Sequence, residues 1–367
     1  MKLIVIIFPI LYLAGNYYVF AKALRLLGST SLFGNCITYV KIGFGILFWL
    51  AAFLMIICIF ARGVNFPVAL HRAMFSFGAV WLVFILYMVM ALVVTDIARL
   101  AFPTFKYGFA TAFVFTCCIL AYGWWNYHTP KIKNVEIVLN KEYEGNFSQI
   151  KAVGISDVHL GYGTGKKQLK KYVELINNQN PDIIFIAGDL IDNSVTPLYK
   201  ESMQEELSQL KAPMGIYMVA GNHEYISGID KSCAFIKETP ITLLRDSIVT
   251  LANGIKLIGR DDKHNRNRKS LDELVAGVSA NNPVIVLDHQ PVELEKADSL
   301  KIDFQFSGHT HRGQIWPISL LTDAIYKQSY GYRKWEHSQV YVSSGLSLWG
   351  PAFRIGTVSE IVVFEIK

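Results

Sequence analysis

Oxygen- and nitrogen-donor side chains gather directly after five apolar runs in the second half of this 367-residue sequence. The runs with their polar ends are KAVGISDVHLG, PDIIFIAGDLID, GIYMVAGNHEY, NPVIVLDHQP and DFQFSGHTHRG. A hydrophobic core excludes polar side chains that lack partners, so this repeated placement indicates a functional site. The donors are two aspartates, one asparagine and four histidines, with a fifth histidine beside them: Asp157, Asp189, Asn222, His159, His289, His309, His311 and His223.

Metal binding is the chemistry that this mixture of donors favours. Taken singly, Asp157 or Asp189 can cap a helix, and a lone His289 is typical of a hydrogen-bonded core histidine. As an ensemble, oxygen and imidazole donors without thiolates favour Zn, Mn or Fe and argue against a structural zinc site. Two divalent ions need about eight ligand places with one group bridging them. Seven donors with one shared carboxylate meet that requirement.

Buried strands are the elements that must position these residues. Each apolar run has the length and continuity of a buried strand. Polar stretches with helical spacing lie between the runs, for example Lys166–Asn178 and Pro197–Leu210. This alternation is typical of βαβ units, and open α/β sheets hold their ligands at the carboxyl ends of strands. The sequence therefore predicts an α/β domain with the donors at the carboxyl ends of its strands.

The five polar blocks resemble the pattern of calcineurin-like metallophosphoesterases, which is D-x-H, GD, GNH[DE], H and GHxH. They occur here in that order as SDVHLG, AGDLID, AGNHEY, DHQP and SGHTHRGQ. The resemblance covers about residues 150–367, and the tail YVSSGLSLWGPAFRIGTVSEI is similar to that of a membrane-associated subgroup. It implies an α/β/β/α fold, which is a β-sandwich flanked by helices.

The resemblance also implies how two ions would share the donors. The first ion would be held by Asp157, His159, Asp189 and His311, and the second by Asp189, Asn222, His289 and His309. Asp189 would bridge them. An amide at that position would leave two dications close together without a shared negative charge, so the bridge requires a carboxylate.

Phosphoester hydrolysis is the reaction that the resemblance implies. A hydroxide that bridges the two ions would attack phosphorus in line. His223 would stabilise a phosphoryl oxygen or protonate the leaving group. The alternative for His223 is a structural histidine bonded to Asp192 or Glu224. The sequence has no H-E-x-x-H motif and no G-x-S-x-G setting, which excludes the metalloprotease and serine hydrolase classes.

Basic residues near these blocks are candidates for substrate binding. The run RDDKHNRNRK, from Arg260 to Lys269, is typical of a solvated loop. It can also form a rim that grips an anionic headgroup or a pyrophosphate, with Arg260 as one contact. Arg312 stands where the related subgroup often has glycine after GHxH, and we expect it to reach the substrate phosphate.

The first third of the sequence has the composition of a membrane region. The whole chain is 52% hydrophobic and 17% charged, with a mean hydropathy of +0.32, which is too apolar for a soluble enzyme. Residues 1–125 carry eight Lys and Arg against one acidic residue, whereas residues 126–367 carry 27 against 28. The basic excess lies in loops between apolar segments, so anionic lipid is the expected partner and nucleic acid is not. The predicted spans are Leu3–Ala21, Ile42–Phe60, Ala73–Thr95 and Tyr107–Tyr127.

Two features of the membrane region stay open. The first span can instead be a secretory signal, because Lys2 precedes it and Ala21-Lys22-Ala23 resembles a cleavage site; its length favours a retained helix. Five basic residues flank the spans on each side, so the side of the membrane that holds the C-terminal domain is undetermined. Asp96 ends the third span, where we expect an interfacial cap.

These observations predict a multi-pass cell membrane protein in three parts: four transmembrane helices in residues 1–127, a linker with a first strand in 128–149, and a metallophosphoesterase domain in 150–367. The expected activity is hydrolysis of a phospholipid or a lipid-linked (pyro)phosphate, such as a diacylated nucleotide sugar. The alternatives are a membrane-anchored phosphodiesterase or phosphatase of a soluble substrate, and a catalytically inactive membrane sensor or scaffold. The sequence does not indicate an oligomeric state.

Overall fold

The computed structural model describes residues 2–29, 33–60, 67–139 and 149–367. Residues 140–148 of the segment predicted over 128–149 therefore lie outside the described residues, as does Arg62, one of the basic residues counted beside the spans. The chain divides into two compact units, one of Met1–Trp124 with Gly350–Ala352 and one of Trp125–Trp349 with Phe353–Lys367. Each unit is described by itself.

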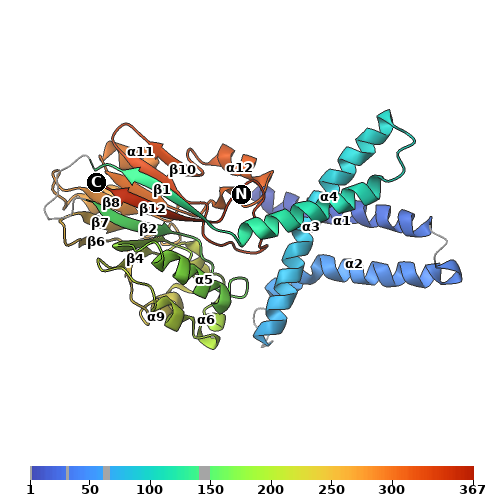
Figure 1. The fold of residues 1–367 in the computed structure, drawn as a ribbon, viewed down its shortest axis with the longest axis horizontal. Coiled ribbons are helices and arrows are strands. Elements are labelled where there is room, and N and C mark those ends of the chain that lie inside the picture. The colour runs from blue at the N-terminus through green and yellow to red at the C-terminus, as the bar shows by residue number, and fades with distance from the viewer. Residues whose placement is uncertain (1, 30–32, 61–66, 140–148) are drawn as a thin grey trace. The chain divides into compact units, whose positions relative to one another are not determined.

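The first unit consists of long apolar helices (Figure 1). In the part of the chain that is described, four helices are long and apolar enough to cross a membrane, as predicted. The helix α3 has 34 residues and so measures about 51 Å, more than the hydrocarbon core of a bilayer. The elements are α1 (Lys2–Gly28), η1 (Gly34–Cys36), α2 (Ile37–Phe60), α3 (Val68–Ala101) and α4 (Gly108–Tyr127).

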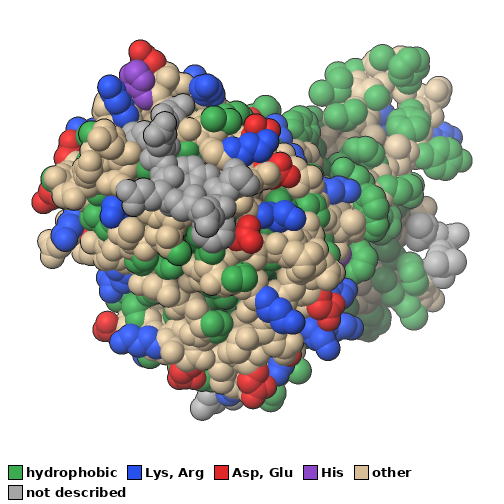
Figure 2. Space-filling model, turned by 60° about the vertical axis from the view of Figure 1, so that its left-hand side comes forward, with side chains coloured by type: hydrophobic (Ala, Val, Ile, Leu, Met, Phe, Trp, Pro, Cys, Tyr) green, Lys and Arg blue, Asp and Glu red, His purple; other side chains and the backbone are tan. Residues whose placement is uncertain are grey.

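Apolar side chains point both into and out of this helical unit. Val19, Phe48 and Met88 belong to its buried core, whereas Leu47 and Val94 are exposed. Figure 2 shows hydrophobic side chains over much of the visible surface of these helices, while charged side chains are scattered over the other unit. Outward apolar surface of this extent is typical of helices whose solvent is lipid.

Asp96 links two of these helices. Its carboxylate lies 2.6 Å from Nζ of Lys22 and accepts a hydrogen bond from the hydroxyl of Tyr18. The expectation that Asp96 caps a helix is wrong, because α1 and α3 pack together and bring Lys22 within reach of the carboxylate. The pair joins α1 to α3.

The described residues of the second unit form two six-stranded mixed sheets. The first sheet has the order β1-β12-β2-β3-β4-β5, and β2, β3 and β4 run parallel in it. Its first strand begins at Lys131, within the segment predicted as a linker with a first strand, and it is an edge strand that pairs with β12. The strands are β1 (Lys131–Ile137), β2 (Ile150–Ile155), β3 (Ile183–Ala187), β4 (Ile216–Val219), β5 (Ile241–Leu244) and β12 (Glu360–Ile366).

The second sheet has the order β10-β11-β9-β8-β7-β6. Its central strands β7, β8 and β9 are parallel neighbours, and β11 continues them in the same direction. The five apolar runs predicted to be strands are confirmed as β2, β3, β4, β8 and β9. The strands of this sheet are β6 (Ser247–Thr250), β7 (Lys256–Gly259), β8 (Val284–Leu287), β9 (Phe304–Ser307), β10 (Gly331–Lys334) and β11 (Gln339–Val342).

Helices cover the outer face of each sheet, which makes the α/β/β/α sandwich that was predicted (Figure 1). The inner faces meet in one core, where the Phe364 ring of β12 packs against Phe304 and Phe306 of β9. The helices are α5 (Lys166–Asn177), α6 (Thr196–Lys200), α7 (Met203–Leu207), α8 (Asn222–Ile226), α9 (Ile229–Ile236), α10 (Leu271–Val275), α11 (Leu294–Ser299), η3 (His311–Gly313) and α12 (Ile318–Ile325).

One predicted helix is divided. The segment Pro197–Leu210 has helical spacing throughout, yet it forms the short helices α6 and α7. Ser202 between them adopts a left-handed conformation with φ of 49°, which interrupts the helix. Propensity alone does not specify this break, after which α7 packs against α5.

Candidate metal centre

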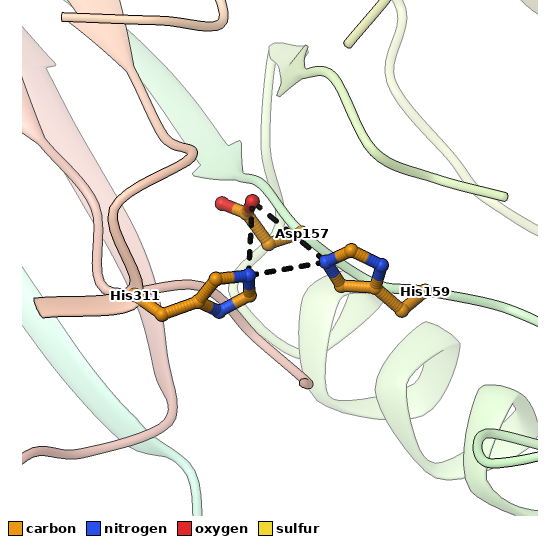
Figure 3. A group of neighbouring side chains, drawn as sticks. All are labelled: Asp157, His159 and His311. Carbon is orange, nitrogen blue, oxygen red and sulfur yellow. Dashed lines mark hydrogen bonds and ion pairs between the residues drawn. The ribbon is translucent and has the colours of Figure 1, made fainter. Parts of the chain in front are cut away.

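Three buried side chains from distant parts of the chain face one another in the first group of donors (Figure 3). Nε2 of His159 lies 3.1 Å from Nε2 of His311. The Asp157 carboxylate lies 3.5 Å from Nε2 of His311 and 3.9 Å from that of His159. Asp157 and His159 follow β2, and His311 begins η3 after β9. Their donor atoms thus converge on a common point.

A second group lies where β3, β4, β8 and β9 end. Oδ2 of Asp189 lies 3.2 Å from Nε2 of His289. The side-chain oxygen of Asn222 lies 3.1 Å from the same nitrogen and 2.8 Å from Nδ1 of His309. Each of these two oxygens and two imidazole nitrogens therefore lies within 3.2 Å of at least one other.

Asp189 stands between the two groups. Its Oδ2 atom, which faces His289, is also 3.8 Å from Nε2 of His159 in the first group. The main-chain N–H of His223 donates to the other oxygen, Oδ1, at 2.8 Å. This contact fixes the carboxylate so that Oδ2 faces both groups.

Backbone contacts orient the His289 ring. Its Nδ1 lies 2.7 Å from the carbonyl oxygen of Ala187, which can only accept, so Nδ1 carries the proton. In the neutral ring, Nε2 then carries the free lone pair that a metal requires. The contact also ties β8 of the second sheet to the end of β3 in the first.

Backbone strain is concentrated at these residues. Twelve non-glycine residues in the described parts of the chain have positive φ, and five of them are donors in the two groups. Each such conformation costs of order 1 kcal/mol or more and persists where the surroundings enforce it. The five are Asp157, His159, Asp189, His309 and His311, with φ between 48° and 71°.

Two glycines permit the close approach of the loops. A Cβ atom on Gly308 would lie 2.4 Å from Oδ2 of Asp157, and one on Gly221 would lie 2.2 Å from Oδ1 of Asp189. Both distances are shorter than any non-bonded contact allows, so these positions require glycine. This is the structural reason for a glycine in AGNHEY and SGHTHRGQ.

The two carboxylates have opposite electrostatic shifts. Burial raises the pKa of Asp157, and the negative charge of Asp189 adds to the rise against the effect of His289. Burial would also raise the pKa of Asp189, but His289 and His159 outweigh it and hold this pKa well below its usual range. The neighbouring imidazoles therefore favour the ionised form of Asp189, whereas burial disfavours that of Asp157.

Comparison with known proteins agrees with this geometry. Residues 150–313 match the family model described as calcineurin-like phosphoesterase. The chain is 33% identical over 264 residues to an uncharacterized metallophosphoesterase of Helicobacter pylori, a match that covers 69% of each chain. This chain belongs to the calcineurin-like metallophosphoesterase family.

Other relatives of this metallophosphoesterase include membrane proteins. The transmembrane protein with metallophosphoesterase domain of Danio rerio is 32% identical over 273 residues, which is 70% of this chain and 62% of that one. The protein of the same name from Bos taurus is 30% identical over 251 residues, or 63% and 56%. With its four long apolar helices, this chain is a membrane protein and a metal-dependent phosphoesterase.

The family uses divalent metals, and the donors fit them. Asp157 and Asp189 are 0% and 2% exposed, and no lysine or arginine forms an ion pair with either within the described ranges. Two buried carboxylates without such partners require another source of positive charge. Carboxylate, amide and imidazole donors in this number are suited to divalent cations.

The structure brings together all eight residues that the sequence singled out around the centre. The seven donors make up the two groups, and the His223 ring lies 4.6 Å from the His159 ring. Arg312 directly follows His311 and stacks on Tyr330, with 4.9 Å between the guanidinium carbon and the ring centre.

Arg260 is not on an exposed rim, so that expectation is wrong. It is 5% exposed, and its Nη1 lies 3.2 Å from Asp288 and 2.8 Å from Glu293. The guanidinium thus pairs with buried Asp288 and with the more exposed Glu293, which are 28 and 33 residues away in sequence. Arg268 of the same loop also lies 3.6 Å from Asp288. The middle of the run is exposed.

Asp192 contacts two histidines of the site, a role that its sequence position did not indicate. Its Oδ1 lies 3.0 Å from Nδ1 of His223 and 3.6 Å from Nδ1 of His159. Burial lowers the pKa of His223, but the bond to Asp192 and the charge of Asp189 outweigh it and raise this pKa to about 9. Glu224, the other partner considered for His223, instead accepts from the main-chain N–H groups of Gly221 and Asp189.

Arg354 is a supporting residue that the analysis of motifs missed. It is fully buried and donates from Nη1 to the His311 carbonyl at 3.0 Å and from Nη2 to three carbonyls of the preceding loop, Ser344, Gly345 and Ser347. Burial lowers its pKa to about 10 against the opposing charge of Glu360, so it stays cationic at neutral pH. It lies in the tail noted above, where no residue type indicated its role.

The end of α4 is hydrogen-bonded to the same segment. Nδ2 of Asn126 donates to the carbonyls of Arg354 and Thr357 at 2.9 and 2.8 Å, and the hydroxyls of Tyr127 and Ser347 are 2.7 Å apart. The main-chain N–H of Ser347 in turn donates to the Asp157 carbonyl at 3.0 Å. These contacts connect the last turn of α4 to the backbone of the first donor group.

The glycine at position 308 provides a test of the close packing. Gly308→Ala places a methyl group against the Asp157 carboxylate, so we expect bound metal to fall and turnover of an aryl phosphoester to drop by roughly 10² or more. Metal content by mass spectrometry and the initial rate measure both. Gly277→Ala is the control, because a Cβ there meets no atom within 4 Å. Equal metal content in the two variants would contradict the steric argument.

Proposed function

We propose that this metallophosphoesterase is a binuclear phosphoester hydrolase whose two metal ions share Asp189. The observation that supports two ions is the position of Asp189 Oδ2, 3.8 Å from His159 in one group of donors and 3.2 Å from His289 in the other. A carboxylate oxygen that faces two separate sets of imidazoles is suited to bridge two cations. The proposed domain for this activity is residues 150–367, completed by strand β1.

Each ion would have four protein ligands in this proposal. Divalent ions such as Mn, Zn or Fe, once bound, supply Lewis-acid polarisation of a phosphoryl oxygen and lower the pKa of a water. The chain contributes fixed donors and a buried setting that strengthens these charges. The first set is Asp157, His159, Asp189 and His311, and the second is Asp189, Asn222, His289 and His309.

His223 is the proposed proton donor. Its Nδ1 is held by Asp192 at 3.0 Å, which leaves Nε2 to face the leaving group. The raised pKa keeps the ring protonated at neutral pH, as an acid requires. Cations bound beside it would offset the charge of Asp189 and lower this pKa toward neutrality, where a ring both gives up and regains a proton readily.

Arg312 is the proposed contact for the substrate phosphate. It follows a proposed ligand directly, and its stacking on Tyr330 holds the guanidinium in place. Guanidinium groups bind phosphate through paired hydrogen bonds. Arg260 has no part in this proposal, since its partners are Asp288 and Glu293.

The proposed substrate is amphiphilic: a phospholipid or a lipid-linked (pyro)phosphate such as a diacylated nucleotide sugar. The argument is physical, because one transmembrane helix anchors a domain effectively irreversibly and this chain has four candidate spans. As a multi-pass protein of the cell membrane, the enzyme meets lipid substrates concentrated in two dimensions. A soluble substrate gains little from that arrangement.

The bridging carboxylate gives the first test of this function. Asp189→Asn should abolish turnover and lower bound metal from about two ions toward one or none, because the shared negative charge is lost. Metal content and aryl phosphoester hydrolysis are measured on the same folded preparation. Asp303→Asn, at another buried aspartate, is the matched control. Normal activity in Asp189→Asn would remove the basis of the two-ion assignment.

His223 gives a second test with a different expected pattern. His223→Ala should keep both ions while the rate falls by roughly 10² to 10⁴, because only the proton donor is lost. The control is His264→Ala, because the side chain of His264 is about half exposed. If His223→Ala loses metal as Asp189→Asn does, His223 is a ligand and the proposed acid is wrong.

Substrate class is tested with the full-length protein in detergent micelles. We expect kcat/KM for a long-chain lipid phosphoester to exceed that for its water-soluble headgroup analogue by roughly tenfold or more, because remote contacts with the lipid add to transition-state binding. A short-chain version of the same lipid, used below its micelle-forming concentration, separates recognition from surface enrichment. A preference for the headgroup analogue would show that the helices only anchor the enzyme.

A further inference from the structure

The helix α12 has an inverted distribution of polar and apolar side chains. Leu320, Leu321 and Ile325 are 59%, 54% and 61% exposed, whereas Ser319 and Thr322 are 7% and 9% exposed. In a helix on the surface of a water-soluble domain the apolar stripe packs inward and the polar residues face water. Here the hydroxyl residues face the protein and the large aliphatic residues face outward.

Another helix of the same domain shows the ordinary pattern. In α5, Leu169, Tyr172 and Ile176 are buried in the core against the first sheet, and Lys170 and Lys171 are exposed. The inversion in α12 is therefore not a general property of this domain. At 100° per residue, the outward side chains Leu320, Ala324, Leu321, Ile325 and Ile318 form one continuous apolar stripe.

The helix stands beside the metal centre. It packs against η3, which carries His311, and a Cβ on Gly313 would lie 2.6 Å from the main-chain nitrogen of Ser319. The residue that ends the helix, Tyr326, has its ring 6.2 Å from the ring of His309. Whatever covers the outer face of α12 therefore lies close to the substrate that the centre would receive.

Basic residues lie at the C-terminal end of this helix. Lys327 lies two residues beyond it and is exposed, although its ammonium also pairs with Glu295. The guanidinium of Arg333 on β10 reaches the Lys327 carbonyl, and Arg333 is exposed as well. Trp316, which precedes the helix, is 45% exposed. Aliphatic residues with an adjacent tryptophan and cations match the interfacial zone of an anionic bilayer.

We propose that the outer face of α12 inserts into the surface of the bilayer and holds the metal centre at the membrane interface. The membrane helices keep the domain within reach of lipid, which supplies a permanent occupant for this apolar face. The proposal concerns contact with bulk lipid and does not depend on the identity of the substrate. The inserted residues are Ile318, Leu320, Leu321, Ala324 and Ile325.

Photocrosslinking of the full-length protein tests this contact. The photoreactive residue p-benzoylphenylalanine replaces Leu321 or, in a second variant, Ile325, and the protein is reconstituted without substrate in vesicles of phosphatidylcholine and radiolabelled phosphatidylglycerol. We expect a protein–lipid adduct at both positions at roughly twice the control yield or more. The control carries the same group at Ile248 of β6, another exposed aliphatic residue of the domain.

Each other outcome overturns the proposal. Lipid adducts no stronger than those at Ile248 mean that the face meets water, and a protein–protein adduct means that a second copy of the chain covers it. Adducts that form only after a lipid phosphoester is added mean that the face binds substrate instead of bulk lipid. The readout does not use turnover, so its failure is distinguishable from failure of the proposed function.

Discussion

The buried charge of Asp157 and Asp189 is the constraint on which the rest of the domain depends. Removal of a carboxylate from water costs several kcal/mol unless opposite charge and hydrogen bonds replace the solvent. A protonated imidazole such as His289 supplies positive charge beside Asp189, but only a neutral ring has the free lone pair that binds a metal. A divalent cation supplies the positive charge that the carboxylates lack, and it accepts the lone pairs of the imidazoles. The stability of this end of the sandwich and its metal content are consequently linked.

Both sheets contribute donor residues to the site. The first sheet contributes the acidic and amide donors and His159 after β2, β3 and β4, while the second contributes His289, His309 and His311 after β8 and β9. A cation at this place therefore ties one sheet to the other. Left-handed backbone at five donors, together with Gly221 and Gly308, lets the loops of the two sheets come close enough to share a cation. The strained backbone costs free energy, and packing of the core keeps it in place.

Much of the site could be predicted because its signals are local. Continuous apolar runs that end in polar residues identify five strands and all seven donors, and uncharged stretches of about 20 residues identify the membrane helices. The partition of the strands between two sheets required the family resemblance, because an apolar run does not specify its neighbour. Arg260 was misplaced for the same reason: Asp288 and Glu293 reach it only through tertiary structure. The roles of Asp192 and Arg354 also depend on distant partners.

The hydrogen bonds from Asn126 and Tyr127 determine where this protein can be cut. A boundary at Lys131, where the first strand begins, is favoured by topology alone. It would remove three contacts, at 2.9, 2.8 and 2.7 Å, that hold the segment around Arg354 and Ser347 behind the Asp157 loop. The buried carbonyls they satisfy would then lack donors. A soluble version for crystallisation or screening should keep at least the last turn of α4.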